Sequence, residues 1–367
     1  MAGRTNLKPS QRHLYRTGAN LRRTLRIAYP PDIGEIVLRT ELDWDRDVLP
    51  VSVSGNGIST FQVEAQHPFV YFKPCLIENS RLHWAKGDNK LLIMTEDDRR
   101  ALYPHFFGDE TGSFYPLLTF DSAILDREHR ARIYLPPGYG ENTLAHYPVA
   151  FLQDGQNLFF PEEAFAGTDW GIDSTHWLLR SMGVVEDIIM VGLYSGETER
   201  INEYTKPGYE SYGRSVVQEV IPQLEAQLRV LQGRRYRSVW GSSLGGVAAF
   251  YMVWQYPETF GAAVCMSSTF SHRDDLLERV LNEKPRDVAF YLDSGWPGDN
   301  YETTIGMAMA LISRGWRWGH NLLHLVFPHA THSEQDWGLR LHVPLQMIAG
   351  SIPRYSRMTA PVLREIA

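Results

Sequence analysis

The chain has 367 residues, which exceeds one typical domain core and predicts two domains. Hydrophobic residues make up 43% and charged residues 22%, as in an ordinary globular protein, and the net charge of −7 gives no reason to expect a nucleic-acid partner. No apolar run of the sequence is long enough to span a bilayer, so we expect no membrane partner. The two cysteines, Cys75 and Cys265, build no disulfide framework, which favours a reducing compartment and predicts a cytoplasmic location.

The front of the chain divides into a basic tail and a β-rich domain. Residues 1–20 carry four basic side chains and no acidic one, so we expect a solvated tail, with a transit peptide or an anion-binding arm as alternatives. Within residues 21–112, Phe61, Val63 and Ala65 alternate with polar residues, as in a strand with one buried face. Short strands separated by turn residues predict a small β-sandwich over 21–112.

Residues 114–355 change to strands that alternate with helices. The expected strands are 131–135, 149–153, 188–193, 236–240, 262–266, 288–293 and 322–327, and the expected helices are 170–181, 214–231, 246–255, 301–314 and 335–349. This order predicts an α/β fold with a mostly parallel central sheet that helices cover on both faces. On such a sheet, ligands bind beyond the C-terminal ends of the strands.

The most specific chemical signal is residues 241–245, Gly-Ser-Ser-Leu-Gly, which have the form G-x-S-x-G. A β-prone stretch precedes them and a helical pattern follows, which is the context of a nucleophile elbow. Glycines two positions before and after Ser243 leave room for so tight a turn. Ser243 is therefore the expected nucleophile, whereas Ser242 lacks glycines at the corresponding positions.

A serine needs a base to take its proton, and histidine suits this role near neutral pH. Of the histidines that follow Ser243, His329 and His332 lie in the loop between the last expected strand and helix. We favour His332, which lies at the start of the helix and is followed by Glu334 and Trp337. His329 is the alternative, and a helix-capping role for His332 is the non-catalytic interpretation.

The acid that orients this histidine should follow a strand between the serine and the histidine. Asp293 ends the strand at 288–293, and Asp299 lies deeper in the next loop. We favour Asp299 because it can reach a histidine on the neighbouring loop, although it is also suited to cap the helix at 301–314. Asp293 stays open as the alternative.

A tetrahedral intermediate needs N–H donors for its oxyanion. One expected donor is the amide of Leu244, directly after the nucleophile. The other is the amide of Gly155 or Gln156, in the loop that follows the strand at 149–153. The alternative for that loop is a plain Asp-Gly turn.

With these segments in place, the chain resembles the esterase family of the α/β-hydrolases that includes esterase D-like enzymes, enterochelin esterases, feruloyl esterases and mycolyltransferases. The resemblance implies an α/β-hydrolase fold and a triad of Ser243, Asp299 and His332. Relatives carry Gly-x-x-Asp where this chain has one residue more between Gly295 and Asp299, which keeps Asp293 open. The matching segments run in family order: 132–139, 152–159, 200–204, 241–246, 256–261, 295–300 and His332-x-Glu334-x-x-Trp337.

The front domain has a parallel in the same family. Enterochelin esterases are similar in carrying an N-terminal β-sandwich related to glycogen-type carbohydrate-binding modules, and residues 38–45 and 84–89 have that character. Trp44 and Trp84 are candidates to stack on a sugar or a catechol. We favour burial of both rings in the core of the sandwich.

The loops expected around the site are rich in aromatic residues, which suits an aromatic or bulky acyl group. The candidate substrate-binding residues are Tyr204, Trp296 and Arg200, of which Arg200 can clamp an anion or pair with Glu203. The full set of aromatic candidates is Phe159, Phe160, Trp170, Tyr204, Tyr209, Tyr212 and Trp296.

The sequence has no phosphate loop, nucleotide fingerprint or metal-ligand spacing, so we expect no cofactor and no metal. The expected function is that of a serine esterase acting through an acyl-enzyme on a small-molecule carboxylic ester, with a siderophore or phenolic ester as the candidate substrate. An acyltransferase with the same triad and a non-catalytic carbohydrate-binding protein are the alternatives. The sequence does not indicate an oligomeric state.

Overall fold

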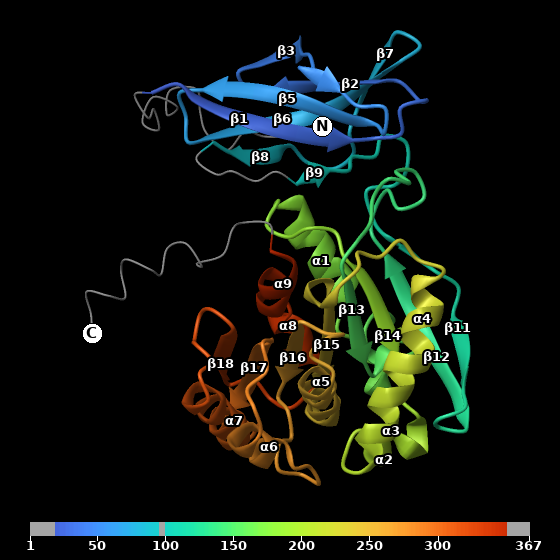
Figure 1. The fold of residues 1–367 in the computed structure, drawn as a ribbon, viewed down its shortest axis with the longest axis vertical. Coiled ribbons are helices and arrows are strands. Elements are labelled where there is room, and N and C mark those ends of the chain that lie inside the picture. Colours follow the sequence, from blue (N-terminus) through green and yellow to red (C-terminus); the bar gives the residue numbers. More distant parts are fainter. Residues whose placement is uncertain (1–18, 95–99, 351–367) are drawn as a thin grey trace. The chain divides into compact units, whose positions relative to one another are not determined.

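The computed structural model describes residues 19–94 and 100–350, and the chain divides into two compact units (Figure 1). Among the described residues, the front unit combines 19–94 and 100–112 with 136–145 and 181–183, and the second unit holds 113–135, 146–180 and 184–350. The segment 136–145 packs with the front unit because the side-chain amide of Asn142 donates to the carbonyl oxygens of Ala28 at 2.9 Å and Pro104 at 2.8 Å.

The front unit is a pair of β-sheets. One sheet has the order β4-β5-β1-β9, and the other has the order β3-β2-β6-β7 with β8 added on β6. Side chains from both sheets, among them Ile27, Leu38, Phe61 and Phe72, form one core, as in a β-sandwich. The strands are β1 Leu21–Ala28, β2 Glu35–Thr40, β3 Asp43–Val48, β4 Ser52–Val53, β5 Ile58–Ala65, β6 Phe69–Glu78, β7 Arg81–Trp84, β8 Lys90–Ile93 and β9 Ala101–Leu102.

The expectation that Trp44 and Trp84 are both buried is wrong. Trp84 is 40% exposed at the end of β7, a four-residue strand at the edge of its sheet. Its ring lies 6.2 Å from that of Trp44, and the guanidinium of Arg39 lies 5.3 Å from the Trp84 ring centroid. Because an edge strand has a neighbour on only one side, its terminal ring stays partly open to solvent.

The second unit is built on one mixed sheet, with the order β10-β12-β14-β13-β15-β16-β17-β18 and with β11 paired to β12. Neighbouring strands from β14 to β18 are parallel, and β12 is antiparallel to β14. The expected mostly parallel sheet is therefore confirmed. The strands are β10 Ser113–Phe114, β11 Leu118–Ser122, β12 Arg127–Leu135, β13 Val149–Gln153, β14 Ile189–Leu193, β15 Arg237–Ser242, β16 Ala262–Met266, β17 Ala289–Trp296 and β18 Leu322–Pro328.

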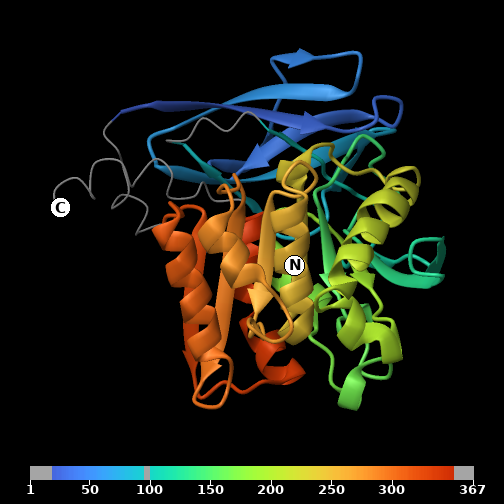
Figure 2. The ribbon, with the colours of Figure 1, turned by 60° about the horizontal axis from the view of Figure 1, so that its bottom comes forward.

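Helices cover both faces of this sheet. On one face, Trp240 of β15 shares a core with residues of α1, α8 and α9. On the other face, the ring of Phe290 on β17 stacks on Phe250 of α5 at 4.4 Å, and Figure 2 shows α5 and α7, in gold and orange, in front of the strands. The helices are α1 Ile172–Ser181, α2 Arg200–Glu203, α3 Gly208–Ser215, α4 Ile221–Glu225, α5 Ser243–Gln255, α6 Leu276–Asn282, α7 Tyr301–Ser313, α8 Glu334–Arg340 and α9 His342–Ala349. Among the residues that the structure describes, no helix combines the length and apolar character needed to cross a membrane.

Two of the expected helices are interrupted at prolines. In place of the helix expected over 214–231, the chain has the end of α3, a π-helical segment at Val216–Val220 and α4, which carries Pro222 in its first turn and ends at Glu225, so residues 226–231 are not helical. The helix expected over 335–349 is divided into α8 and α9 at Leu341, and Pro344 lies in the first turn of α9. Proline cannot donate the hydrogen bond to the carbonyl four residues earlier, so the regular ladder changes there.

The carboxylate of Glu141 organises a turn of the front unit. It accepts hydrogen bonds from the amides of Phe106 at 2.6 Å, Phe107 at 2.9 Å and Gly108 at 3.1 Å, and from the Tyr29 hydroxyl at 2.9 Å. Burial acts to raise the pKa of Glu141, but these hydrogen bonds outweigh it and lower the pKa below its ordinary value. Its stabilising effect is thus present above the unfolded-state pKa of about 4.3 and is lost as the pH falls through the folded-state value.

Glu141→Gln is predicted to destabilise the front unit by about 1–3 kcal/mol at pH 7, because the amide replaces a charged acceptor of these hydrogen bonds. The difference from the unchanged protein should shrink at pH 3, because this pH lies below the unfolded-state pKa and the stabilising effect falls there. Urea unfolding followed by fluorescence at both pH values measures this. Glu35→Gln on exposed Glu35 is the control, and an equal destabilisation at both pH values would contradict the prediction.

Candidate active site

Ser243 lies at the junction of β15 and α5, where the backbone is strained. Its φ is 54°, in the left-handed region that non-glycine residues rarely adopt. The turn is so tight that a Cβ at Gly241 would lie 2.3 Å from the carbonyl carbon and oxygen of Gly245. The close approach of these two glycines therefore holds the serine in its strained conformation at the end of the strand.

The structure brings Ser243, His332 and Asp299 together. The Nε2 atom of His332 lies 2.9 Å from the Oγ of Ser243, and its Nδ1 lies 2.7 Å from the Oδ1 of Asp299. The three residues come from the loops after β15, β17 and β18, at the C-terminal edge of the parallel strands. The His332 side chain is 34% exposed and that of Asp299 is fully buried, so the imidazole faces solvent and the carboxylate lies behind it.

The alternative acid has other partners, and the alternative base is held through its backbone amide. Asp293 is fully buried, and its Oδ1 accepts hydrogen bonds from Arg340 at 2.9 Å and from the amide of Ser267 at 3.1 Å. The amide of His329 donates to the carbonyl oxygen of Trp296 at 2.7 Å. In the part of the chain that the structure describes, the carboxylate that contacts His332 is that of Asp299.

The extra residue between Gly295 and Asp299 is accommodated within the loop, since the amide of Gly295 donates to the Oδ2 of Asp299 at 2.7 Å. Burial alone would raise the pKa of Asp299. Hydrogen bonds from His332, from the Ser267 hydroxyl and from the amides of Gly295 and Asn300 outweigh burial and hold this pKa well below its ordinary value. Asp299 therefore stays ionised beside the imidazole, as an orienting acid must.

The loop after β13 is tightly packed against the sheet. Asp154 has a φ of 56°, and a Cβ at Gly155 would lie 2.3 Å from the carbonyl group of Gly192 on β14. The Gln156 side chain donates to the Ser195 hydroxyl at 3.1 Å and accepts from the Ser195 amide at 3.2 Å. These contacts fix the backbone of the two residues expected to carry the second oxyanion donor.

The amide of Leu244 lies in the first turn of α5, where N–H groups have no acceptor within the helix. Gly245, in the same turn, packs against the loop after β13, because a Cβ there would lie 3.1 Å from both the Oδ2 of Asp154 and the Cβ of Gln153. The elbow and the loop after β13 are therefore in direct contact.

Arg200 is paired with that loop. Its Nε and Nη2 atoms lie 2.7 and 2.8 Å from the two carboxylate oxygens of Asp154, which is 3% exposed. Desolvation would lower the pKa of Arg200, but the bidentate pair with Asp154 raises it above its ordinary value. The expected pair with Glu203 is wrong, because Glu203 binds Arg127 with both oxygens at 2.6 Å.

Tyr204, expected to contact substrate, is fully buried, and its hydroxyl accepts a hydrogen bond from the Asp154 amide at 3.2 Å. The expectation that Tyr204 contacts substrate is therefore wrong. Tyr204 lies in the core and supports the loop after β13 through this hydrogen bond. Tyr209 and Tyr212 are at most 1% exposed as well, whereas Trp296 is 51% exposed. An aromatic residue in a loop sequence looks the same whether its ring lies in the core or at the surface, so the sequence could not separate them.

Several residues around the site were not found from the sequence. Asn157 donates to Glu334 at 3.3 Å and thereby joins the loop after β13 to the helix that follows His332. Burial raises the pKa of Glu334, and the nearby charge of Asp154 adds to this. Ser267, which contacts Asp299, directly follows β16 and so lies at the same edge of the sheet as Ser243. The position of Ser267 directly after a strand was the signal from which the sequence could have placed it at the site.

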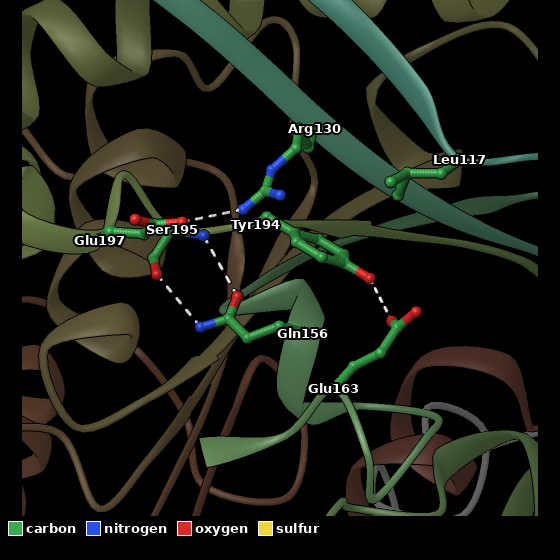
Figure 3. A pocket seen from close by; sticks show the side chains of 7 residues that line it. All are labelled: Leu117, Arg130, Gln156, Glu163, Tyr194, Ser195 and Glu197. Atoms are coloured by element: carbon green, nitrogen blue, oxygen red, sulfur yellow. Dashed lines mark hydrogen bonds and ion pairs between the residues drawn. The ribbon is translucent and has the colours of Figure 1, made fainter.

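A pocket of about 350 Å³ opens beside Gln156 (Figure 3). Within it, Arg130 lies 3.1 Å from Glu197, and the Tyr194 hydroxyl donates to Glu163. Its lining is Leu117, Arg130, Gln156, Glu163, Tyr194, Ser195 and Glu197. Among residues 19–94 and 100–350, no three His, Cys, Asp or Glu side chains are grouped to hold a metal ion.

A family model described as Putative esterase matches residues 122–346 of the chain. Among curated proteins, Uncharacterized protein YbbA of Bacillus subtilis (strain 168) is 25% identical over 164 residues, which cover 39% of this chain and 60% of YbbA. The chain thus matches less than two thirds of that relative's length.

Two solved structures share the fold. A ferulic acid esterase has a TM-score of 0.54 and 20% identity and covers 65% of this chain and 98% of its own. The enterobactin esterase FES from Shigella flexneri, in the presence of enterobactin, has a TM-score of 0.54 and 15% identity and covers 90% of this chain and 93% of its own. At these identities the likeness establishes the α/β-hydrolase fold, and the second match extends into the front unit.

Arg200→Gln is predicted to lower kcat for p-nitrophenyl acetate by about tenfold to a hundredfold and to leave KM within about twofold, because it loosens the loop that is expected to carry an oxyanion donor. Arg200→Lys should not restore kcat, since an ammonium cannot form the bidentate pair. Arg234→Gln, at an exposed pair with Asp287, is the control. A rise in KM at unchanged kcat would instead make Arg200 a substrate clamp.

Proposed function

The chain belongs to the Putative esterase family, and from this premise we propose that it is a serine hydrolase that cleaves carboxylic esters. Ser243 is the nucleophile, His332 the general base and acid, and Asp299 the residue that orients the imidazole. The observation that carries the proposal is the continuous pair of contacts at 2.9 Å from Ser243 to His332 and at 2.7 Å from His332 to Asp299. Such a chain is what an alcohol side chain needs to become a nucleophile at neutral pH.

In the proposed reaction, the Oγ of Ser243 attacks the ester carbonyl carbon while the Nε2 of His332 takes the hydroxyl proton. The carbonyl oxygen becomes an oxyanion, which the amides of Leu244 and of Gln156 or Gly155 stabilise. His332 then gives its proton to the departing alcohol, and an acyl-Ser243 remains. Water, deprotonated by His332, attacks the acyl group, and the same steps release the acid and restore Ser243.

The pocket beside Gln156 is the proposed place for one part of the substrate. Ser195 follows β14, two strands away from β15 in the sheet, which corresponds to about 10 Å from the elbow. A substrate with its carbonyl at the amide of Gln156 can therefore extend into this pocket. The pocket is lined by tyrosine, arginine and carboxylate groups, which suit a part rich in hydroxyl groups.

For the other part of the substrate, the exposed ring of Trp296 supports an aromatic group, and we propose a siderophore or phenolic ester. An acyltransferase would use the same side chains and differ in the acceptor, so product analysis with competing alcohols separates the two activities. A non-catalytic carbohydrate-binding protein would leave Ser243 unlabelled by a fluorophosphonate probe.

The cytoplasmic location stays a proposal. It is supported by the state of Cys75 and Cys265, which are both buried free thiols and therefore compatible with a reducing compartment. Fractionation of cells that produce the protein, followed by immunoblotting, tests it.

Ser243→Ala is predicted to lower kcat/KM for short p-nitrophenyl esters by at least about a thousandfold and to abolish labelling by a fluorophosphonate, because no other hydroxyl is presented to His332 in the described residues. Ser242→Ala, one residue earlier and buried, is the matched control and should keep activity within about tenfold. An unchanged rate in Ser243→Ala would remove the serine mechanism.

Leu117→Trp is predicted to lower kcat/KM for a bulky feruloyl or catecholate ester by about tenfold, because the indole fills the pocket beside Gln156. The rate with p-nitrophenyl acetate should stay within about twofold, since this ester does not reach the pocket. Leu339→Trp, at a side chain that is 70% exposed, serves as the control. An equal loss of kcat/KM with both esters would show that the bulky substrate does not bind in the pocket beside Gln156.

A further inference from the structure

A buried ion pair lies behind the proposed triad acid. Arg340 of α8 is 2% exposed, and its Nη2 atom lies 2.9 Å from the Oδ1 of Asp293 and 3.9 Å from the Oδ2 of Asp299. The same Nη2 donates to the Ser267 hydroxyl at 2.6 Å. The Tyr291 hydroxyl donates to the other oxygen of Asp293 at 2.8 Å. A fully desolvated Asp–Arg pair has a high electrostatic cost, so its place directly behind the site calls for a function.

The direction of the hydrogen bonds in this cluster is determined by chemistry. A guanidinium group has only donors, so the Ser267 oxygen must accept from Arg340. Its single proton is then free to point to the Oδ2 of Asp299, which the Ser267 hydroxyl contacts. The positive charge of Arg340 polarises that hydroxyl and strengthens the hydrogen bond that it gives to the carboxylate.

Ser267 itself is held from every side. Its φ is 42°, an unfavourable value for a residue other than glycine. Its amide donates to the backbone oxygen of Asp293 at 2.9 Å and to the Oδ1 of the same residue at 3.1 Å, and its carbonyl oxygen accepts from Asn300 at 2.7 Å. A strained serine with this many fixed contacts is positioned to donate its hydroxyl proton to Asp299 while its oxygen accepts from Arg340.

The charges that face Asp299 come from each element packed around it. Arg340 of α8 and Asp293 of β17 compensate each other, so Asp299 contributes the net negative charge behind His332. Tyr291 of β17 adds a neutral donor, and Asp336 at the start of α8 hydrogen bonds to Thr331 and Ser333. Removal of the charge on Asp293 alone would leave Arg340 uncompensated and cancel the charge that Asp299 offers to the imidazolium.

We propose that Ser267, Arg340 and Asp293 are positioning residues of the esterase site, which aim Asp299 at His332 through the Ser267 hydroxyl and keep the carboxylate charge available to the imidazolium. The proposal rests on the proposed function, because it assigns a role that is meaningful only if His332 acts as the base. It also assigns a role to Asp293, which was the alternative triad acid in the sequence analysis: Asp293 neutralises Arg340, the cation that orients Asp299 through Ser267.

The first test replaces the hydroxyl alone. Ser267→Ala is expected to lower kcat for p-nitrophenyl acetate by about tenfold to a hundredfold, the range for loss of one hydrogen bond to a charged group, with KM within about twofold. The downfield proton NMR signal of the His332 Nδ1 proton should shift. Ser268→Ala is the matched control, because the neighbouring Ser268 is fully buried and its Oγ has no hydrogen-bond partner among the described residues. Unchanged kcat and NMR signal in Ser267→Ala would overturn the proposal.

The second test uses the pH dependence of kcat/KM. This dependence should not change if Asp293 and Arg340 only stabilise the fold. In Asp293→Asn the net charge behind His332 becomes neutral, so the acid limb of kcat/KM should move to lower pH, because protonation of the base becomes harder. In the double variant Asp293→Asn with Arg340→Met the net charge is restored, and the limb should return toward its original position. If the acid limb of kcat/KM lies at the same pH in the unchanged protein, in Asp293→Asn and in the double variant, the proposed effect of charge on His332 is wrong.

The two levels of the proposal fail in different ways. If fluorophosphonate labels Ser243 and Ser243→Ala is inactive while Ser267→Ala equals Ser268→Ala, the esterase mechanism stands and the positioning role falls. If Ser243 is neither labelled nor needed, the proposed function falls first. Thermal unfolding of each variant shows whether it is folded, and the single-atom change Ser267→Ala keeps the test available if Asp293→Asn does not fold.

Discussion

The close approach of β15 to the first turn of α5 is the constraint on which the site depends. A Cβ at position 241 would lie only 2.3 Å from the backbone of Gly245, so no residue other than glycine fits there. This close approach holds Ser243 at a φ of 54°. The packing of the buried strand and helix on either side offsets the conformational free energy of this strain. Because Gly245 also packs on Asp154 and Gln153, the same turn sets the position of the loop after β13.

Two ion pairs with buried carboxylates flank this turn. On one side Asp154, after β13, binds Arg200, and on the other Asp293, within β17, binds Arg340. Each carboxylate lies in or directly after a strand of the parallel sheet, and each arginine comes from a helix. A carboxylate at such a position is desolvated and needs a cation or several donors to stay charged. We interpret the two pairs as rigid supports of the loop after β13 and of Asp299, the proposed triad acid.

Much of the second unit follows from local sequence patterns. The G-x-S-x-G pentapeptide identified the turn at Ser243 because only glycines tolerate the required backbone contacts. The alternation of strands and helices identified the mostly parallel sheet, and chain order narrowed the acid to Asp293 or Asp299. The sequence failed where one side chain has several partners within reach: an anion clamp and a pair with Glu203 were the alternatives for Arg200, but it binds Asp154, 46 residues earlier in the chain. It failed also for Tyr204 and Trp84, because burial depends on what packs against a ring.

The sequence by itself determined the class of fold, the strained serine and the residue types around it, since these depend on local backbone sterics and on hydrophobic period. Tertiary structure decided which acid faces His332. Asp299 and Asp293 are only six positions apart, but Asp293 lies within β17 and is buried against Arg340, whereas Asp299 lies in the loop after β17 and contacts His332. The physical reason is that the choice depends on a cation from α8 and a hydroxyl after β16, two groups distant in sequence that only the folded sheet places beside both carboxylates.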